Sequence, residues 1–214
     1  MAAAVKVYGV AKSWNIARVH LILEEASVEY EVVAVDFAAT EHKCPAHLAR
    51  NLCTLDSLAL LCILATLSFS SHVRSRNVCR KYKPELLGIG NQELEGSAMV
   101  DVPIMDAILM EIRIRPIFGQ RVDESAVEGN IEKLKKVLEV YESRQSSSRY
   151  LAGDFISLAD LNHVSTILCL GITPYRSVLD AYPRVRAWWD CLRARPAVRR
   201  VSDLMNTSVK NDLK

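Results

Sequence analysis

Residues 5–37, VKVYGVAKSWNIARVHLILEEASVEYEVVAVDF, contain a strand pattern, a helix pattern and a second strand pattern in succession. Val5 to Gly9 is a short β-type run that ends in glycine, and the valine-rich, partly alternating run from Tyr30 to Phe37 predicts the second strand. Between them, Ser13 precedes apolar residues at helical spacing, namely Ile16, Val19, Ile22 and Leu23. This order predicts a small α/β unit.

The chain after Gly88-Ile-Gly90 has the pattern of helices only. One stretch has a clean amphipathic stripe, formed by Ile131, Leu134, Val137, Leu138 and Tyr141. Ser157 and Asp160 form a capping box with Asp in place of Glu, which predicts the start of another helix. Pro103 and Pro116 are expected to interrupt the region before the stripe. The predicted fold class is therefore α/β plus all-α.

Composition excludes several classes of protein. The chain has 214 residues and a formal net charge of +2, which argues against a basic nucleic-acid binder and against an acidic tail protein. Half of the residues are hydrophobic, as in an ordinary globular protein. The apolar run from Leu58 to Phe69 is too short to span a bilayer, and the first residues lack the pattern of a signal peptide.

The six cysteines are Cys44, Cys53, Cys62, Cys79, Cys169 and Cys191. None of them has the spacing of a CxxC pair, which argues against a zinc ribbon and against a dithiol redox site. We therefore expect free thiols in a reducing compartment, and no metal site.

Several stretches together match a known family. In the first half they are Val5-Lys-Val-Tyr-Gly9, Ser13-x-Asn-x-Ala-Arg-Val19, Glu41-His-Lys43, His47-Leu-Ala-Arg-Asn51 and Arg80-Lys-Tyr-Lys83. In the second half they are Val122-Asp-Glu-Ser125, 132–142, Tyr150-Leu-Ala-Gly-Asp-Phe155, Ala159-Asp-Leu-Asn-His163, Ala181-Tyr-Pro183 and Ala187-Trp-Trp189. The chain thus resembles the plant phi-class glutathione transferases over most of its length outside residues 52–76 and about 103–120.

The resemblance implies a thioredoxin-like domain over residues 1–83, followed by an all-helical domain over residues 90–214 that carries the hydrophobic-substrate side. It implies a cytosolic homodimer that conjugates reduced glutathione to electrophilic hydrophobic compounds, a detoxification reaction. Glutathione is then a cosubstrate, and no metal or dissociable redox cofactor is needed. Neither a nucleic-acid partner nor a membrane partner is expected.

Ser13 has two interpretations. From the residues alone it is an ordinary N-cap, although a hydroxyl at a helix N-terminus can also donate a hydrogen bond to a thiolate. The resemblance places the catalytic serine of the family on Ser13. It also assigns His42 and Lys43, which sit in a polar turn, to the glycyl carboxylate region of glutathione.

Other conspicuous residues have structural interpretations. Trp188 and Trp189 are expected to pack in the interior, and His163 is expected to be a structural histidine with its hydrogen bonds satisfied. An arginine run is expected to be a solvated helix face, because no aromatic residues interleave with it. The run consists of Arg193, Arg195, Arg199 and Arg200.

Residues 52–76 depart from the family. They contain no Phe-Gly-Gln turn, no proline and no Glu-Ser pair. The resemblance implies that the Glu-Ser pair would hold the γ-glutamyl end of glutathione, and that a cis-proline would let a neighbouring backbone pair with the tripeptide. The genetic code permits an explanation. A codon choice for 54–57, read from its third base, gives Phe-Gly-Gln. The same shift over 64–76 gives Gly-Asp-Leu-Glu-Leu-Phe-Glu-Ser-Arg-Ala-Ile-Ala.

We therefore hypothesise that residues 52 to about 76 are a frame-shifted translation of a normal glutathione site. Two sources stay open, an error in the recorded gene and a real pair of compensating insertions or deletions. Sequencing the transcript across codons 50–80 separates them, because a read in the printed frame makes the change real. The region from Val102 to Val122 also lacks about a dozen residues that the family has in a helix of the substrate side.

These departures leave a second functional class open, a catalytically impaired or non-catalytic ligand-binding protein with the same fold. A third class, a thiol oxidoreductase, is disfavoured because no cysteine stands at the position of Ser13.

The uncharged run from Leu58 to Phe69 predicts a less stable N-terminal part. Limited proteolysis of the full chain is expected to cut within residues 52–76 before it cuts the helical half, since local opening exposes the backbone. Mass spectrometry of the first fragments checks this. A region 52–76 as resistant as the helical half would contradict the prediction.

Overall fold

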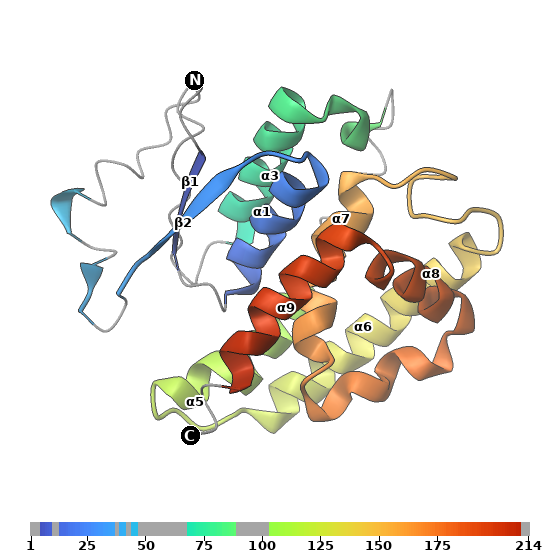
Figure 1. The fold of residues 1–214 in the computed structure, drawn as a ribbon. Helices are drawn as coiled ribbons and strands as arrows, with labels where there is room; N and C mark the ends of the chain where they lie inside the picture. Colours follow the sequence, from blue (N-terminus) through green and yellow to red (C-terminus); the bar gives the residue numbers. More distant parts are fainter. Residues whose placement is uncertain are drawn as a thin grey trace. The chain divides into compact units, whose positions relative to one another are not determined.

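The computed structural model describes residues 5–9, 13–36, 39–41, 44–46, 68–88 and 103–210, and their side chains except those of 68–74 and 206–210 (Figure 1). The chain divides into two compact units, Met1–Leu87 with Pro196–Lys214, and Gly88–Arg195. Pro196–Lys210, helix α9, thus groups with the first unit, whereas the boundary predicted from the sequence placed it in the helical domain.

The first unit begins with the strand-helix-strand order that the sequence predicts. Strand β1, Val5–Gly9, pairs in parallel with strand β2, Tyr30–Ala34, in a register that runs from Val5 opposite Tyr30 to Gly9 opposite Ala34. Helix α1, Trp14–Glu25, makes the connection that a parallel pair requires. The predicted existence of all three elements is confirmed.

Strand β2 ends at Ala34, earlier than the predicted end at Phe37, which lies outside the described residues. Asp36 is the physical reason for the early end. Its carboxylate accepts a hydrogen bond from the backbone N–H of Ala39 at 2.9 Å, and its own N–H donates to the carboxylate of Glu41 at 2.8 Å. Such local side-chain bonds stabilise a turn in place of a ladder.

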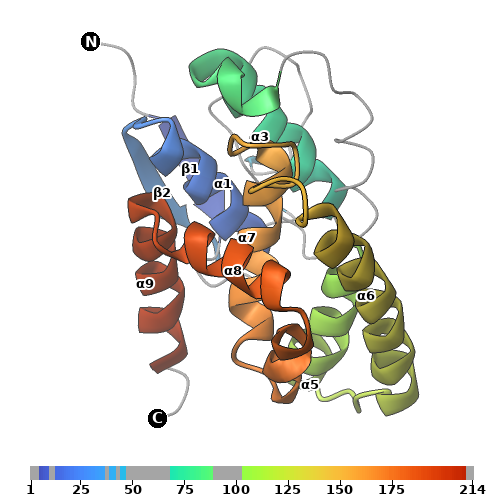
Figure 2. The ribbon, with the colours of Figure 1, turned by 90° about the vertical axis from the view of Figure 1, so that its right-hand side faces the viewer.

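Two further helices of the first unit, α3 and α9, pack beside α1 (Figures 1 and 2). Helix α3 spans Ser68–Tyr82. Helix α3 begins at Ser68, within the residues 52–76 that depart from the family pattern. Val78 and Cys79, in its C-terminal part, are buried. Lys83 follows α3, and its ammonium donates to the backbone oxygen of Glu25 at the end of α1.

The second unit begins, within the described residues, with helical residues 103–109, followed by a π-helical turn, Met110–Ile114, and helix α5, Arg115–Ile117. The sequence predicted an interruption at Pro116. The chain instead stays helical, and the wider turn immediately precedes the proline. Proline lacks an N–H and clashes with the carbonyl four residues back, and a π turn accommodates that defect.

Three longer helices complete the second unit, α6, Glu124–Arg144, α7, Leu158–Leu170, and α8, Pro183–Arg193. A 3-10 helix, Pro174–Ala181, precedes α8, which packs against both α6 and α7 (Figure 2). The predicted stripe of α6 is buried, except that Val137 is half-buried and Val127 extends the stripe at its start.

Asp160 ties three parts of the second unit together. Its carboxylate is fully buried and accepts four hydrogen bonds. Two come from the N–H and the hydroxyl of Ser157, at 2.8 and 2.9 Å, which confirms the predicted helix start. The others come from the N–H of Leu151 and the indole N–H of Trp188, both at 2.9 Å. A buried carboxylate is tolerable here because four donors replace its hydration.

Substitution Asp160→Ala is expected to lower the free energy of unfolding by about 2–4 kcal/mol, because four buried donors lose their acceptor. Urea unfolding followed by circular dichroism measures it. The control is Asp190→Ala on α8, an exposed residue whose ion pair with Arg193 spans 3.8 Å and is expected to contribute less than about 0.5 kcal/mol. Equal losses in the two variants would contradict this assignment.

Candidate glutathione site at the start of helix α1

Ser13 stands at the amino end of α1, beyond the carboxyl end of β1. Its backbone is extended, with φ −74° and ψ 125°, and its carbonyl oxygen accepts the first helical hydrogen bond, from the N–H of Ala17 at 2.9 Å. Its hydroxyl makes no capping bond to any residue that the structure describes. Ser13 therefore occupies the N-cap position, while its half-buried hydroxyl is not used by the cap.

The amino end of α1 favours an anion. The first turn contains no acidic side chain, so no carboxylate of the helix itself offsets the partial positive charge of its free N–H groups. Helix α1 has 12 residues, 11 of them buried, and it is therefore held rigidly in the unit. A thiolate placed beside Ser13 would meet both the helix end and a hydroxyl donor.

His42 and Lys43 lie outside the described residues. The residues on either side of them are described, and the N–H of Cys44 donates to the carbonyl oxygen of Glu41 at 3.0 Å. The predicted turn over 41–45 includes these two residues and stays a prediction. The assignment of both side chains to glutathione stays a prediction.

Helix α1 also buries polar side chains that the sequence did not single out. The guanidinium of Arg18 donates to the side-chain oxygen of Asn15 at 3.0 Å, and both residues are buried. His20 is buried and stacks on Tyr30 with a ring-centre distance of 5.0 Å. Burial lowers the pKa of His20 from 6.5 to about 4, so its imidazole is neutral near pH 7. Its sequence neighbours are apolar, and the single sequence carried no signal for it.

The described cysteines, Cys44, Cys79, Cys169 and Cys191, are all free thiols, as predicted. Burial raises the pKa of the Cys79 thiol to about 12, so Cys79 is protonated and unreactive at neutral pH. Within the described ranges, no group of His, Cys, Asp and Glu side chains could hold a metal ion, and no helix is long and apolar enough to cross a membrane.

The structural interpretations of the second unit are confirmed. Trp188 and Trp189 are buried. The imidazole of His163 contacts the carbonyl oxygen of Ala159 at 2.7 Å and the Tyr141 hydroxyl at 3.3 Å. The enclosed cavity beside these rings measures only about 10 Å³, which is too small for an organic substrate.

Two members of the arginine run form ion pairs. Arg193 pairs with Asp190, and Arg200 of α9 pairs with Glu24 of α1 at 2.8 Å. The side chains of both arginines are more than half exposed, as expected for a solvated helix face.

Comparisons with known proteins agree with this geometry. The family described as glutathione S-transferase, N-terminal domain, matches residues 3–53, and the glutathione S-transferase C-terminal domain matches residues 104–196. A probable glutathione S-transferase of Oryza sativa subsp. japonica is 50% identical, over 95% of this chain and 98% of its own length. Glutathione S-transferase 1 of Zea mays is 49% identical, over 96% and 99%.

The chain belongs to the glutathione S-transferase family. A solved structure of maize glutathione S-transferase I in complex with an atrazine glutathione conjugate matches with a TM-score of 0.81 and 45% identity, over 95% of this chain and 99% of that chain. The fold is thus the thioredoxin-like domain followed by the helical domain of this family, and the relatives include plant phi-class members. By family the chain is an enzyme, a glutathione transferase.

The N-terminal family match also bears on the aberrant segment. It ends at residue 53, at the point where the departure from the family pattern begins at residue 52. Residues 52–67 lie outside the described residues, so the frame-shift hypothesis stays a prediction.

The buried His20 predicts a pH dependence of stability. The unfolded chain binds a proton at His20 below about pH 6.5, and the folded chain only near pH 4. The stability that neutral His20 contributes is thus complete above pH 6.5 and is lost as the pH falls towards 4. Between pH 7 and pH 5 the free energy of unfolding should fall by about 2 kcal/mol more than in His20→Phe, which keeps a ring against Tyr30. Urea unfolding at both pH values tests this, and parallel losses would refute it.

Proposed function

We propose that the chain conjugates reduced glutathione to hydrophobic electrophiles, with Ser13 as the residue that stabilises the thiolate. The supporting observation is the hydroxyl of Ser13, which stands at the amino end of α1 and makes no capping bond within the described residues. A hydroxyl that donates to a thiolate and a helix end that favours an anion both lower the pKa of the bound thiol. More thiolate at neutral pH means more nucleophile.

In the proposed reaction the thiol of glutathione releases its proton to solvent, and the thiolate sulfur attacks an electrophilic carbon and forms the carbon–sulfur bond. In a substitution the leaving group departs with the electron pair of its broken bond. In an addition the electron pair of the double bond takes up a proton from solvent. Ser13 keeps its own proton and acts only as a hydrogen-bond donor. His42 and Lys43 are proposed to hold the glycyl carboxylate of glutathione, where a cation and a donor suit a carboxylate. Glutathione is consumed as a cosubstrate, and the scheme requires no metal or redox cofactor.

The same proposal includes the compartment, the oligomeric state and the partners of the enzyme. We place the enzyme in the cytosol as a homodimer whose small-molecule partners are glutathione and apolar electrophiles, without a nucleic-acid or membrane partner. Maize glutathione S-transferase I, to which the chain is similar, forms a complex with a glutathione conjugate of atrazine. That complex supports the class of acceptor.

A second candidate function is a ligand-binding member of the family with impaired catalysis. It is favoured by one observation, that residues 52–76 lack the Glu-Ser pair that would hold the γ-glutamyl end and the proline that would let the backbone pair with the tripeptide. Such a protein would keep the helical domain and lose turnover. Rates of conjugation separate it from the first candidate.

Substitution Ser13→Ala is expected to lower kcat/KM for conjugation to an aryl halide about 10- to 100-fold, the loss of one hydrogen bond to a charged group. The pKa of the bound thiol, followed by thiolate absorbance in the ultraviolet, should rise in the same variant. The matched control is Ser125→Ala in the exposed first turn of α6, for which no change is expected.

Two results would count against the proposal. Turnover that is unchanged in Ser13→Ala would remove Ser13 from the mechanism. Conjugation no faster than the uncatalysed reaction, in a folded wild-type chain, would favour the ligand-binding alternative.

A further inference from the structure

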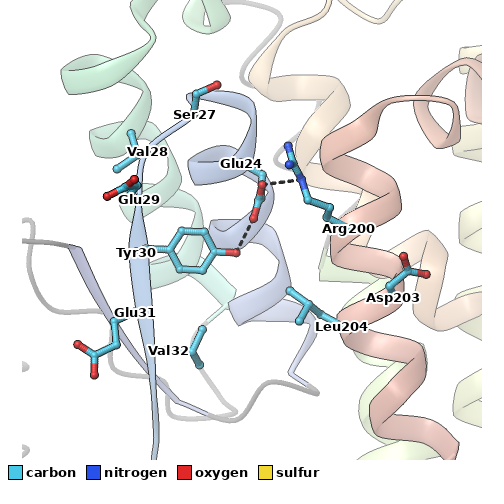
Figure 3. A pocket seen from close by; sticks show the side chains of 10 residues that line it. All are labelled: Glu24, Ser27, Val28, Glu29, Tyr30, Glu31, Val32, Arg200, Asp203 and Leu204. Atoms are coloured by element: carbon cyan, nitrogen blue, oxygen red, sulfur yellow. Dashed lines mark hydrogen bonds and ion pairs between the residues drawn. The ribbon is translucent and has the colours of Figure 1, made fainter.

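The first unit has a groove on its surface that the transferase chemistry does not use. It lies between β2 and α9, above the end of α1, and its volume is about 1020 Å³ (Figure 3). Five consecutive residues, Val28 to Val32, line one side of it, and Arg200, Asp203 and Leu204 of α9 line the other. That volume is at the upper end of the range of small-molecule pockets.

Strand β2 presents an edge along this groove. Among the described residues, β2 pairs only with β1, so its opposite edge has no partner strand there. An edge strand offers a row of N–H and C=O groups that a further extended segment can join. Three consecutive residues of β2, Tyr30 to Val32, line the groove, so this edge of the strand borders it.

The side chains along β2 alternate between two directions. Tyr30 and Val32 point towards α9, whereas Glu29 and Glu31 point to the other side (Figure 3). Val32 and Leu204 are exposed, at 41% and 39%, and they form an apolar floor. A strand added here would meet an apolar surface with every second side chain and carboxylates with the others.

The charge of the groove is negative. Its lining side chains include the carboxylates of Glu24, Glu29, Glu31 and Asp203 and the guanidinium of Arg200. Arg200 already forms an ion pair with Glu24, which also accepts a hydrogen bond from the Tyr30 hydroxyl at 2.9 Å. Glu31 makes an ion pair with Lys6 at 3.4 Å in which both side chains are at least half exposed, and such a pair is weak.

We propose that this groove is a docking site for an extended basic peptide segment of a partner protein, which adds to the edge of β2 that no strand of the described residues occupies. Main-chain hydrogen bonds to β2 hold the segment, alternate apolar side chains rest on Val32 and Leu204, and intervening lysine or arginine side chains meet Glu29 and Glu31. The Glu24–Arg200 ion pair joins α1 to α9 and holds the far wall in place.

The probe that tests this site is a fluorescent hexapeptide of alternating valine and lysine, titrated with the full chain and followed by anisotropy. One control peptide carries glutamate in place of lysine, and a second carries N-methylated backbone amides that cannot pair with β2. The variant is Glu29→Lys, an exposed residue outside the candidate glutathione site. The matched control variant is Glu128→Lys on α6, where the glutamate is also exposed.

The proposal predicts saturable binding of the lysine peptide, at least tenfold weaker binding of both control peptides, and at least tenfold weaker binding of the lysine peptide to Glu29→Lys but not to Glu128→Lys. Conjugation rates should be the same in all of these proteins, which keeps this test separate from the proposed function. Equal binding of the N-methylated peptide, or unchanged binding to Glu29→Lys, would overturn the proposal. So would sedimentation that shows a second copy of this chain in the groove, with a dimer that Glu29→Lys dissociates.

Discussion

The parallel pairing of β1 with β2 is the constraint on which the candidate site depends. Parallel strands need a crossover, and α1 supplies it by running back from the carboxyl end of β1. Ser13 therefore stands where ligands bind in α/β folds, at the carboxyl end of a strand and the amino end of a helix. Burial of 11 residues of α1 then fixes that end of the helix in place.

The sequence predicted the β1-α1-β2 order, the stripe of α6 and the start of α7, because each has a strong local signal. It did not predict the start of α3 at Ser68, since that stretch is polar and has no apolar period. It expected a break at Pro116, whereas a π turn absorbs the missing N–H. In the candidate site, the sequence could name Ser13, but only the coordinates show that its hydroxyl makes no capping bond within the described residues. His20 and the Glu24–Arg200 pair depend on contacts between distant segments, which no local pattern encodes.

Membership of the family and binding of glutathione depend on different parts of the chain. Family membership rests on both domains and on relatives that match over nearly the whole length. Occupancy of the glutathione site depends on fewer residues, because the N-terminal match stops at residue 53. If the half of the site that holds the γ-glutamyl end is altered, α1 and the turn at 41–44 must supply the binding energy. This makes the affinity for glutathione the quantity on which the account rests.

Calorimetric titration of the full chain with reduced glutathione tests that account most directly. Performed in two buffers of different ionisation enthalpy, it reports both the affinity and the protons released when the thiol becomes a thiolate. The account predicts saturable binding between micromolar and millimolar, with proton release near pH 7 that Ser13→Ala reduces. A folded chain that binds no glutathione, or binds it without releasing a proton, would contradict the central claim that the start of α1 activates the thiol.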